Sequence, residues 1–204
     1  RLVTGTAPGQ KFPVVNLRLG TTRGTNALLE RKGAKVGLLC SRGLKDVWKI
    51  GNQSRSDLFD LKVSQPMSLL HAVREVDERL DAEGKVLEDL NENQVAACCA
   101  ELRREGAESL AICFVNSFIN PAHEEKVAAI AADYGFDYIV LSSNTSRRIK
   151  LLDRGDTSIV DAYLSPIIKK YVQSIEESLP GASLRLMTSA GGLVSIKNFS
   201  GKDS

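Results

Sequence analysis

The residues best suited to chemistry lie in a short threonine-rich turn. Gly20, Thr21 and Thr22 follow an apolar stretch and precede a run of helix-forming residues. The first turn of a helix offers N–H groups without intrahelical acceptors, and its positive dipole end favours a phosphate or carboxylate. Gly20 permits close approach of the backbone, Thr25 adds a third hydroxyl, and Asn26 could bind a substrate amide or carboxylate. The turn is therefore a candidate anion site, unless one threonine only caps the helix and the others satisfy backbone groups.

A second turn with similar properties lies near the end of the sequence. Ser189-Ala190-Gly191-Gly192 follows the apolar segment 184–187. Adjacent glycines permit positive φ angles and present no Cβ atom to an approaching ligand. Ser189, Gly191 and Gly192 are therefore ligand-binding candidates, and the alternative is an ordinary tight turn.

Two arginines complete the set of candidate binding residues. Arg55 falls in the polar, irregular segment 51–64, which is typical of a long exposed connection, and Arg154 follows Asp153. A guanidinium can bind an anionic substrate group through two parallel hydrogen bonds. The alternative for each is a solvated surface arginine.

Other polar residues do not form a catalytic or metal-binding pattern. Asp77 and Glu78 are adjacent in a predicted strand and would point to opposite faces, so we expect them to be charges, together with Arg79, on an exposed or domain-contact strand. His71 and His123 are the only histidines, and His123, in the first turn of a predicted helix, is expected to be structural. The catalytic residues stay unknown, and no metal site is predicted.

The cysteines indicate a reducing compartment. They are scattered, contain no Cys-x-x-Cys pair and fall mostly in apolar segments: Cys40, Cys98, Cys99 and Cys113. A free cysteine in such a segment behaves as a small hydrophobic residue. We therefore expect no disulfide or zinc scaffold and a cytoplasmic location.

An alternation of strands and helices must position the candidate turns. Apolar or alternating runs predict strands at 14–19, 36–40, 72–80, 110–115, 138–141 and 184–187. Helical spacing and capping residues predict helices at 25–32, 93–105, from Pro121 onwards, and at 157–179, the last kinked at Pro166. The runs 36–40 and 110–115 are uninterrupted and predict central buried strands. Segments 14–19 and 36–40 are expected to form a right-handed parallel crossover, so the fold class is α/β.

Composition excludes several classes of protein. The 204 residues are 43% hydrophobic and 25% charged, typical of a globular protein with one large or two small domains. Lys and Arg total 27 against 25 Asp and Glu, with no basic stripe, so no nucleic-acid partner is expected. No apolar run approaches the roughly 20 residues that cross a bilayer, so no membrane partner is expected. The first residues carry no start Met or signal core, which indicates a trimmed end.

Six segments, in order, resemble the hydantoinase/oxoprolinase family of ATP-dependent enzymes: LRLGTTRGTNALLERKGAK (17–35), SRGLKDVWKIGNQSR (41–55), REVDERLDAEGKV (74–86), NSFINPAHE (116–124), DAYLSPIIKKY (161–171) and MTSAGGL (187–193). The resemblance implies a mixed, mostly parallel sheet with flanking helices, as part of an actin/Hsp70/sugar-kinase-like architecture. It also implies ATP and Mg²⁺ in the full-length enzyme. The family's DxGGTFTD-type and SGPAGG-type phosphate segments do not occur in these residues. We therefore expect the isolated fragment to be inactive and to bind no cofactor.

The resemblance further implies a domain division, a reaction and a partner. Residues 1–150 would form the N-terminal-type α/β domain without its first phosphate loop, and 151–204 a long helix with the start of the following hydantoinase A-type domain. The expected reaction is ATP-dependent opening of a cyclic amide or imide of the hydantoin or 5-oxoproline type. Two alternatives are a ketone carboxylase subunit of the same family and a non-catalytic scaffold. The expected partner is a second subunit of the hydantoinase B type.

Overall fold

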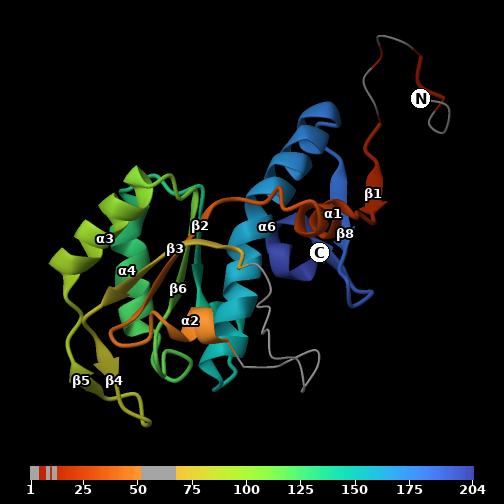
Figure 1. The fold of residues 1–204 in the computed structure, drawn as a ribbon. Helices are drawn as coiled ribbons and strands as arrows, with labels where there is room; N and C mark the ends of the chain where they lie inside the picture. Colours follow the sequence, from red (N-terminus) through yellow and green to blue (C-terminus); the bar gives the residue numbers. More distant parts are fainter. Residues whose placement is uncertain (1–4, 8–9, 11–12, 52–67) are drawn as a thin grey trace, which may run out of the picture. The chain divides into compact units, whose positions relative to one another are not determined.

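The computed structural model describes residues 5–7, 10, 13–51 and 68–204. The chain divides into two compact units (Figure 1). Residues Ala34–Tyr163 form the inserted unit, and the flanking segments Arg1–Gly33 and Leu164–Ser204 form the terminal unit. Each unit has its own sheet, so each is described separately.

The inserted unit is built on a parallel sheet of four strands in the order β3-β2-β6-β7. The strands are β2 (Val36–Ser41), β3 (Leu70–Val76), β6 (Ser109–Cys113) and β7 (Tyr138–Leu141). Every residue of β2 and β6 is buried. This confirms the prediction of two central buried strands, because a parallel strand covered on both faces needs an uninterrupted apolar sequence.

Helices α3 (Glu92–Arg104) and α4 (Ala122–Ala132) pack beside each other and carry the main core of this unit (Figure 1). Helix α3 begins where the Asn91 side chain accepts a hydrogen bond from Gln94 N, and it is followed by Gly106 at φ +94°. The predicted span 93–105 is thus confirmed within a residue. The helices and the sheet bury an apolar cluster that includes Leu39, Val95, Leu102, Leu110, Ile112 and Val127. Each such side chain contributes about 1.5–3 kcal/mol to folding.

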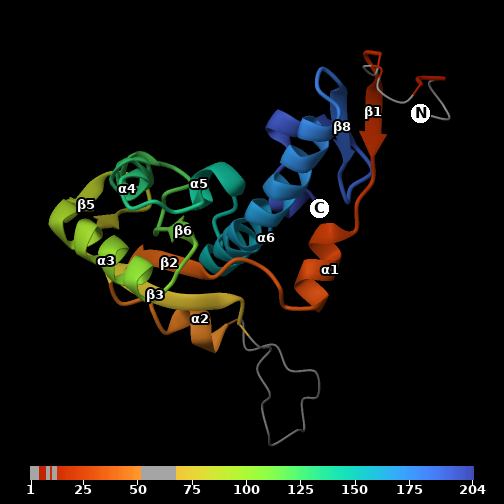
Figure 2. The same ribbon diagram turned by 90° about the horizontal axis from the view of Figure 1, so that it is seen from above.

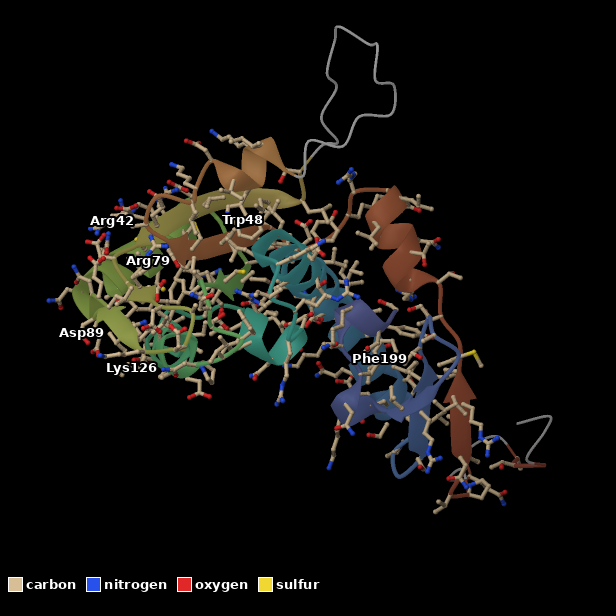
Figure 3. All side chains as sticks on the ribbon, turned by 90° about the horizontal axis from the view of Figure 1, so that it is seen from below. Arg42, Trp48, Arg79, Asp89, Lys126 and Phe199 are labelled. Atoms are coloured by element: carbon tan, nitrogen blue, oxygen red, sulfur yellow. The ribbon has the colours of Figure 1, made fainter. Side chains whose placement is uncertain are left out.

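A second packing layer in this unit joins Trp48, the sheet and the start of a long helix. Trp48 lies in the short helix α2 (Val47–Ile50) (Figure 3). Its ring lies so close to Gly155 that a Cβ atom there would collide with it, and Cys113 Sγ lies 3.2 Å from the same position. Gly155 therefore allows helix α6 (Leu151–Ser178) to approach the tryptophan.

A small antiparallel hairpin follows β3. Strands β4 (Arg79–Leu80) and β5 (Val86–Glu88) pair in antiparallel orientation and are joined by the segment 81–85. Asn116, at φ +58°, donates from its side chain to the carbonyls of Leu80 (3.1 Å) and Asp81 (2.9 Å). This amide therefore fastens the hairpin to the end of β6.

The terminal unit contains a three-stranded sheet in the order β1-β8-β9. Strand β1 (Asn16–Leu19) pairs in parallel with β8 (Ser183–Met187), which pairs antiparallel with β9 (Leu193–Ser195). Ile168 and Val172 of α6 pack with Leu186, Leu19, Ile196 and Phe199 to form its core. The segment that follows β9 contains two short 3-10 helices, Ile196–Asn198 and Gly201–Asp203.

Three predictions of local structure are wrong. The predicted crossover from 14–19 to 36–40 does not exist, because β1 pairs with β8 and β2 pairs with β3 and β6 in a separate sheet. The first helix, α1, spans Arg23–Leu29 rather than 25–32, and Arg31, which was predicted to lie inside it, adopts the left-handed conformation at φ +56°. Helix α6 begins at Leu151, six residues before the predicted start at residue 157. The charged residues and the glycine at 153–156 interrupt the apolar spacing from which the start was predicted.

The predictions for 51–64 cannot be compared with the fold, because residues 52–67 lie outside the described part of the chain. Among the described residues, no helix has the length and apolar character of a membrane span.

Candidate functional site

The two candidate turns follow neighbouring parallel strands of the terminal unit. Leu19 of β1 lies opposite Leu186 of β8, so the chain leaves both strands at the same edge of the sheet (Figures 1 and 2). Gly20 directly follows β1, and Thr188 and Ser189 directly follow β8. The carboxyl edge of parallel strands is where α/β proteins commonly bind ligands. The sheet therefore brings together two turns that the sequence suggested only separately.

The first turn leads into α1, and its threonine hydroxyls differ in the hydrogen bonds that they make. Thr21 Oγ1 accepts a hydrogen bond from Arg23 N at 3.2 Å, so Thr21, the residue before the N-cap residue Thr22, satisfies the first N–H group of the helix. The Thr22 side chain makes no capping bond, and Thr22, Thr25 and Asn26 are exposed. Both interpretations of the turn thus apply, to different threonines. Helix α1 has only seven residues, so its dipole adds little to anion binding.

The two glycines of this turn have different surroundings. A Cβ atom at Gly20 would meet nothing within 4 Å, whereas one at Gly24 would collide with the side chain of Ser204. Gly24 is buried, and the Arg23 guanidinium lies 4.5 Å from the centre of the Tyr171 ring. Packing therefore explains why residue 24 is a glycine, whereas the space around Gly20 would accept a larger side chain.

The second turn closes the hairpin between β8 and β9. Thr188 N donates to Gly192 O at 2.8 Å, and Gly191 N donates to Thr188 O at 2.9 Å. Gly191 has a φ of +83°, which favours glycine. Ser189 N donates to Asp203 O at 2.8 Å, while Ser189 and both glycines are exposed. The turn has the geometry of an ordinary hairpin and leaves the Ser189 hydroxyl at the surface.

The donors at this edge fit an anion better than a metal ion. They are threonine and serine hydroxyls, an asparagine amide and backbone N–H groups, none of which carries negative charge. No group of three or more His, Cys, Asp or Glu side chains that could hold a metal occurs among the described residues. The described residues therefore offer no cage for Mg²⁺, which binds oxygen ligands that usually include carboxylates.

The corresponding edge of the inserted unit is filled by buried side chains, beginning with Glu78. Its carboxylate accepts a hydrogen bond from Ser41 Oγ and lies 2.8 Å from His123 Nδ1, and Val115 N donates to the Ser41 hydroxyl at 3.0 Å. Glu78 is completely buried and His123 is 4% exposed. The prediction of Glu78 as an exposed strand charge is wrong, because the turn after β3 directs it inward; His123 is structural, as predicted.

Glu124 and Arg154 form the second half of this buried polar cluster. Glu124 accepts hydrogen bonds from Phe114 N (3.1 Å), Ser142 Oγ (2.6 Å), Ser143 N (2.9 Å) and Ser143 Oγ (2.7 Å). Arg154 Nε donates to the same Ser142 hydroxyl at 2.9 Å, and its Nη2 donates to Phe114 O at 2.5 Å. Both side chains are completely buried. The alternative of a solvated surface arginine is therefore wrong for Arg154.

None of the other candidate residues is among the described residues of the terminal unit's sheet edge. Arg55 is outside the described residues, and Arg154 belongs to the inserted unit with each of its guanidinium nitrogens engaged by protein acceptors. The cysteines are free and buried. Burial raises the pKa of Cys40, Cys99 and Cys113 to about 12, so these thiols are protonated near neutral pH and are poor nucleophiles.

Sequence reasoning missed Ser41, Glu78, Glu124 and Ser142 as one buried cluster. Each follows a strand or begins a helix near the same sheet edge. The available signal was a polar residue placed directly after an uninterrupted apolar strand, as at Ser41 and Ser142. For Glu124, the signal was an acidic residue in the first turn of a helix that follows a buried strand.

Known families and proteins resemble the chain along most of its length. The family described as hydantoinase/oxoprolinase N-terminal region matches residues 3–135, and that described as hydantoinase/oxoprolinase matches residues 154–204. The 5-oxoprolinase of Saccharomyces cerevisiae is 36% identical over 94% of this chain, and the caprolactamase subunit alpha of Pseudomonas jessenii is 32% identical over 85%. The chain spans 17% and 26% of these two relatives.

Two solved structures share the fold. The ATP-dependent caprolactamase of Pseudomonas jessenii superimposes with a TM-score of 0.75 at 29% identity, covering 85% of this chain and 26% of that one. A nucleotide-free acetone carboxylase gives a TM-score of 0.75 at 23% identity, covering 92% and 29%, and this likeness concerns the fold alone. The predicted α/β fold of the actin/Hsp70/sugar-kinase-like kind is confirmed.

Proposed function

The chain belongs to the hydantoinase/oxoprolinase family, and we propose that it forms part of an enzyme that uses ATP to open a cyclic amide. The relatives named 5-oxoprolinase and caprolactamase support this reaction class. Because the chain spans only 17% of the first and 26% of the second, the rest of the catalytic apparatus belongs to the longer protein.

The proposed reaction has two steps. The γ-phosphoryl group of ATP is transferred to the amide oxygen of the ring, and ADP leaves. In the hydrolytic step, water attacks the activated carbonyl carbon and the C–N bond of the ring breaks, which frees the amine and leaves an acyl phosphate, and a second water hydrolyses this acyl phosphate to the carboxylate and inorganic phosphate. Binding and electrostatic stabilisation of the phosphoryl oxygens are the main contributions a protein makes to phosphoryl transfer.

The main support for a role of this chain in the reaction is the sheet edge at which both β1 and β8 end. It presents the Thr22 and Thr25 hydroxyls, the Asn26 amide and the Ser189 hydroxyl from turns that leave adjacent strands. We propose that this edge binds a phosphoryl group or the substrate carboxylate, with Gly20, Gly191 and Gly192 keeping the approach free of side chains. Thr21 supports the turn by accepting a hydrogen bond from Arg23 N, the first N–H group of α1. Mg²⁺, when bound, would neutralise phosphate charge through ligands outside the described residues.

Several further features of the enzyme are part of the same proposal. A second subunit of the hydantoinase B type is supported by the relative named as an alpha subunit. A cytoplasmic location is supported by free cysteines in the described part of the chain. The family matches to residues 3–135 and 154–204 support a division into an N-terminal-type domain, 1–150, and the start of a second, 151–204.

A ketone carboxylase is the second candidate function. The likeness to acetone carboxylase supports it at the level of fold. In that case ATP would activate a ketone or bicarbonate, and the same edge would bind phosphate. A scaffold that only docks a partner is the third possibility, and it predicts no turnover.

The deciding experiment is an assay of the full-length protein with its second subunit. We expect ADP formation that depends on 5-oxoproline, a hydantoin or a lactam, with one ring opened per ATP consumed. ADP formation that depends on a ketone and bicarbonate would favour the carboxylase. If no substrate of either class stimulates ADP formation, the enzymatic proposal fails.

A further inference from the structure

The loop between β7 and α6 in the inserted unit is strongly basic, and the proposed function gives it no role. Four consecutive residues, Arg147, Arg148, Ile149 and Lys150, are all exposed, and Ile149 is 74% exposed. We call residues 147–150 the basic loop. No ion pair joins its three cations to an acid in the part of the chain that the structure describes. This loop therefore offers three cations and one apolar side chain to a binding partner.

Two other arginines at the surface of this unit are neutralised by carboxylates. Arg42 pairs with Asp77 at 3.1 Å and Glu88 at 2.9 Å, and Arg74 pairs with Glu101 at 2.9 Å. Figure 3 shows Arg42 and Arg79 next to each other at the hairpin, where Arg79 Nη2 donates to Arg42 O at 2.7 Å. Among the described residues, the basic loop thus places three cations without an ion pair within four consecutive residues, in contrast to Arg42 and Arg74.

The backbone of the basic loop is held by Arg154. Arg154 Nη1 donates to Arg148 O at 2.9 Å and Ile149 O at 3.5 Å, and Arg154 N donates to Lys150 O at 3.1 Å. Three consecutive carbonyls are therefore fixed by one residue whose side chain is completely buried. A loop ordered in advance loses less conformational entropy on binding than a flexible one.

We propose that the basic loop is a docking element for an acidic segment of the second subunit, with Ile149 as its apolar contact. The inference rests on the proposed function, which supplies that subunit. Cations surrounding an exposed aliphatic residue match a protein surface that places carboxylates around an apolar patch. Nucleic acid is less favoured, because the loop has no aromatic residue for stacking and the whole chain has only two excess positive charges.

The test measures association of the full-length protein with the purified second subunit. Charge reversal in Arg147→Glu/Arg148→Glu should lower the association rate constant roughly tenfold at low salt, with the difference shrinking as salt rises. Ile149→Ser should weaken binding mainly by faster dissociation. The matched control is Lys169→Glu/Lys170→Glu, which makes the same charge change at exposed residues of α6 and should alter both rates less than twofold.

The outcomes separate this inference from the proposed function. Loss of association in the loop variants, with ADP formation recovered at saturating second subunit, supports the docking element. Unchanged association overturns it while leaving the enzyme assignment intact, and so does an equal loss in the control. Absence of any association in the wild type also overturns it. Binding of duplex DNA or of phosphatidylserine vesicles that the loop variants abolish, with subunit association unchanged, would assign the loop to that ligand instead.

Discussion

The two parallel-sheet edges of this protein share a topology but differ in what occupies them. In the inserted unit, the carboxyl edge is filled by Ser41, Glu78, Glu124, Ser142 and Arg154, with the β4–β5 hairpin fastened beside it. In the terminal unit, the carboxyl edge of β1 and β8 carries exposed hydroxyls and glycines. The rule that ligands bind at such edges therefore applies only where the protein has left the edge free.

The difference between the two edges also indicates which residues contribute to stability and which are available for binding. Buried carboxylates and guanidinium groups remain folded inside a protein only when hydrogen bonds replace their hydration, and each of those in the inserted unit is supplied with several. The exposed groups of the terminal edge remain hydrated and can exchange water for a ligand. Substitutions at the first edge should therefore change stability, and those at the second should change turnover.

The largest expected effect is at Arg154. Arg154→Met removes the donors to Ser142, Phe114 and the basic loop and leaves the Glu124 carboxylate buried without a nearby cation. We expect the free energy of unfolding to fall by about 3–5 kcal/mol. Chemical denaturation measures it, with Arg42→Met as the control, since that side chain is 57% exposed and its loss should cost at most about 1 kcal/mol. Equal losses in the two variants would show that the buried cluster is no more stabilising than a surface ion pair.

A smaller effect should distinguish two glycines. Gly155→Ala places a methyl group against the Trp48 ring and should lower the free energy of unfolding by about 1–3 kcal/mol. Gly20→Ala has open space around the new methyl group and should change it by less than about 0.5 kcal/mol. Thermal unfolding of the two variants measures both. A large loss for Gly20→Ala would mean that the first turn has a structural requirement for glycine.

The buried thiols predict a loss of stability at alkaline pH. Burial raises the pKa of Cys40, Cys99 and Cys113 to about 12 from 9.0 in the unfolded chain. Near pH 9 the unfolded state therefore releases protons that the native state retains, and stability decreases as pH rises. From pH 7.5 to pH 9 the three thiols together should cost about 1 kcal/mol. Denaturation at both pH values measures this, and Cys40→Ala/Cys99→Ala/Cys113→Ala should flatten the dependence.

The sequence predicted the elements well where local signals were strong. The runs at 36–40 and 110–115 were central strands because their uninterrupted apolar residues need cover on both faces. Helical spacing of apolar residues predicted a helix at 93–105, which lies within one residue of α3 at each end, and Gly106 at φ +94° follows α3. Such signals depend on neighbouring residues, so they can be read without knowledge of the fold.

Long-range pairing could not be read in the same way. Strand β1 pairs with β8, which is more than 160 residues away, and no local property of 14–19 favours β8 over β2 as its partner. Glu78 and Arg154 were misjudged for a related reason: their burial depends on Ser41, His123, Ser142 and Phe114, which the fold brings from other elements. The convergence of the two turns followed from the same unpredicted pairing.

The smallest expected effect on stability concerns the two threonines before α1. Thr21→Val removes the acceptor of Arg23 N and should lower the free energy of unfolding by about 0.5–1 kcal/mol. Thr22→Val removes an exposed hydroxyl that makes no capping bond and should leave it nearly unchanged. The matched pair thus separates the hydroxyl that supports the start of α1 from the hydroxyl of the candidate site, within one turn.

The activity of the same pair decides whether the open edge binds a ligand. If Thr22 donates to a phosphoryl group or a substrate carboxylate, Thr22→Val should reduce kcat/KM of the full-length enzyme about tenfold, equivalent to about 1.4 kcal/mol of transition-state binding. Thr21→Val should reduce turnover only in proportion to the fraction of unfolded protein. Steady-state kinetics on enzyme of verified folded fraction measures both. If Thr22→Val turns over like the wild type, Thr22 leaves the proposed site, and the contrast between a filled and an open edge loses its functional meaning at this turn.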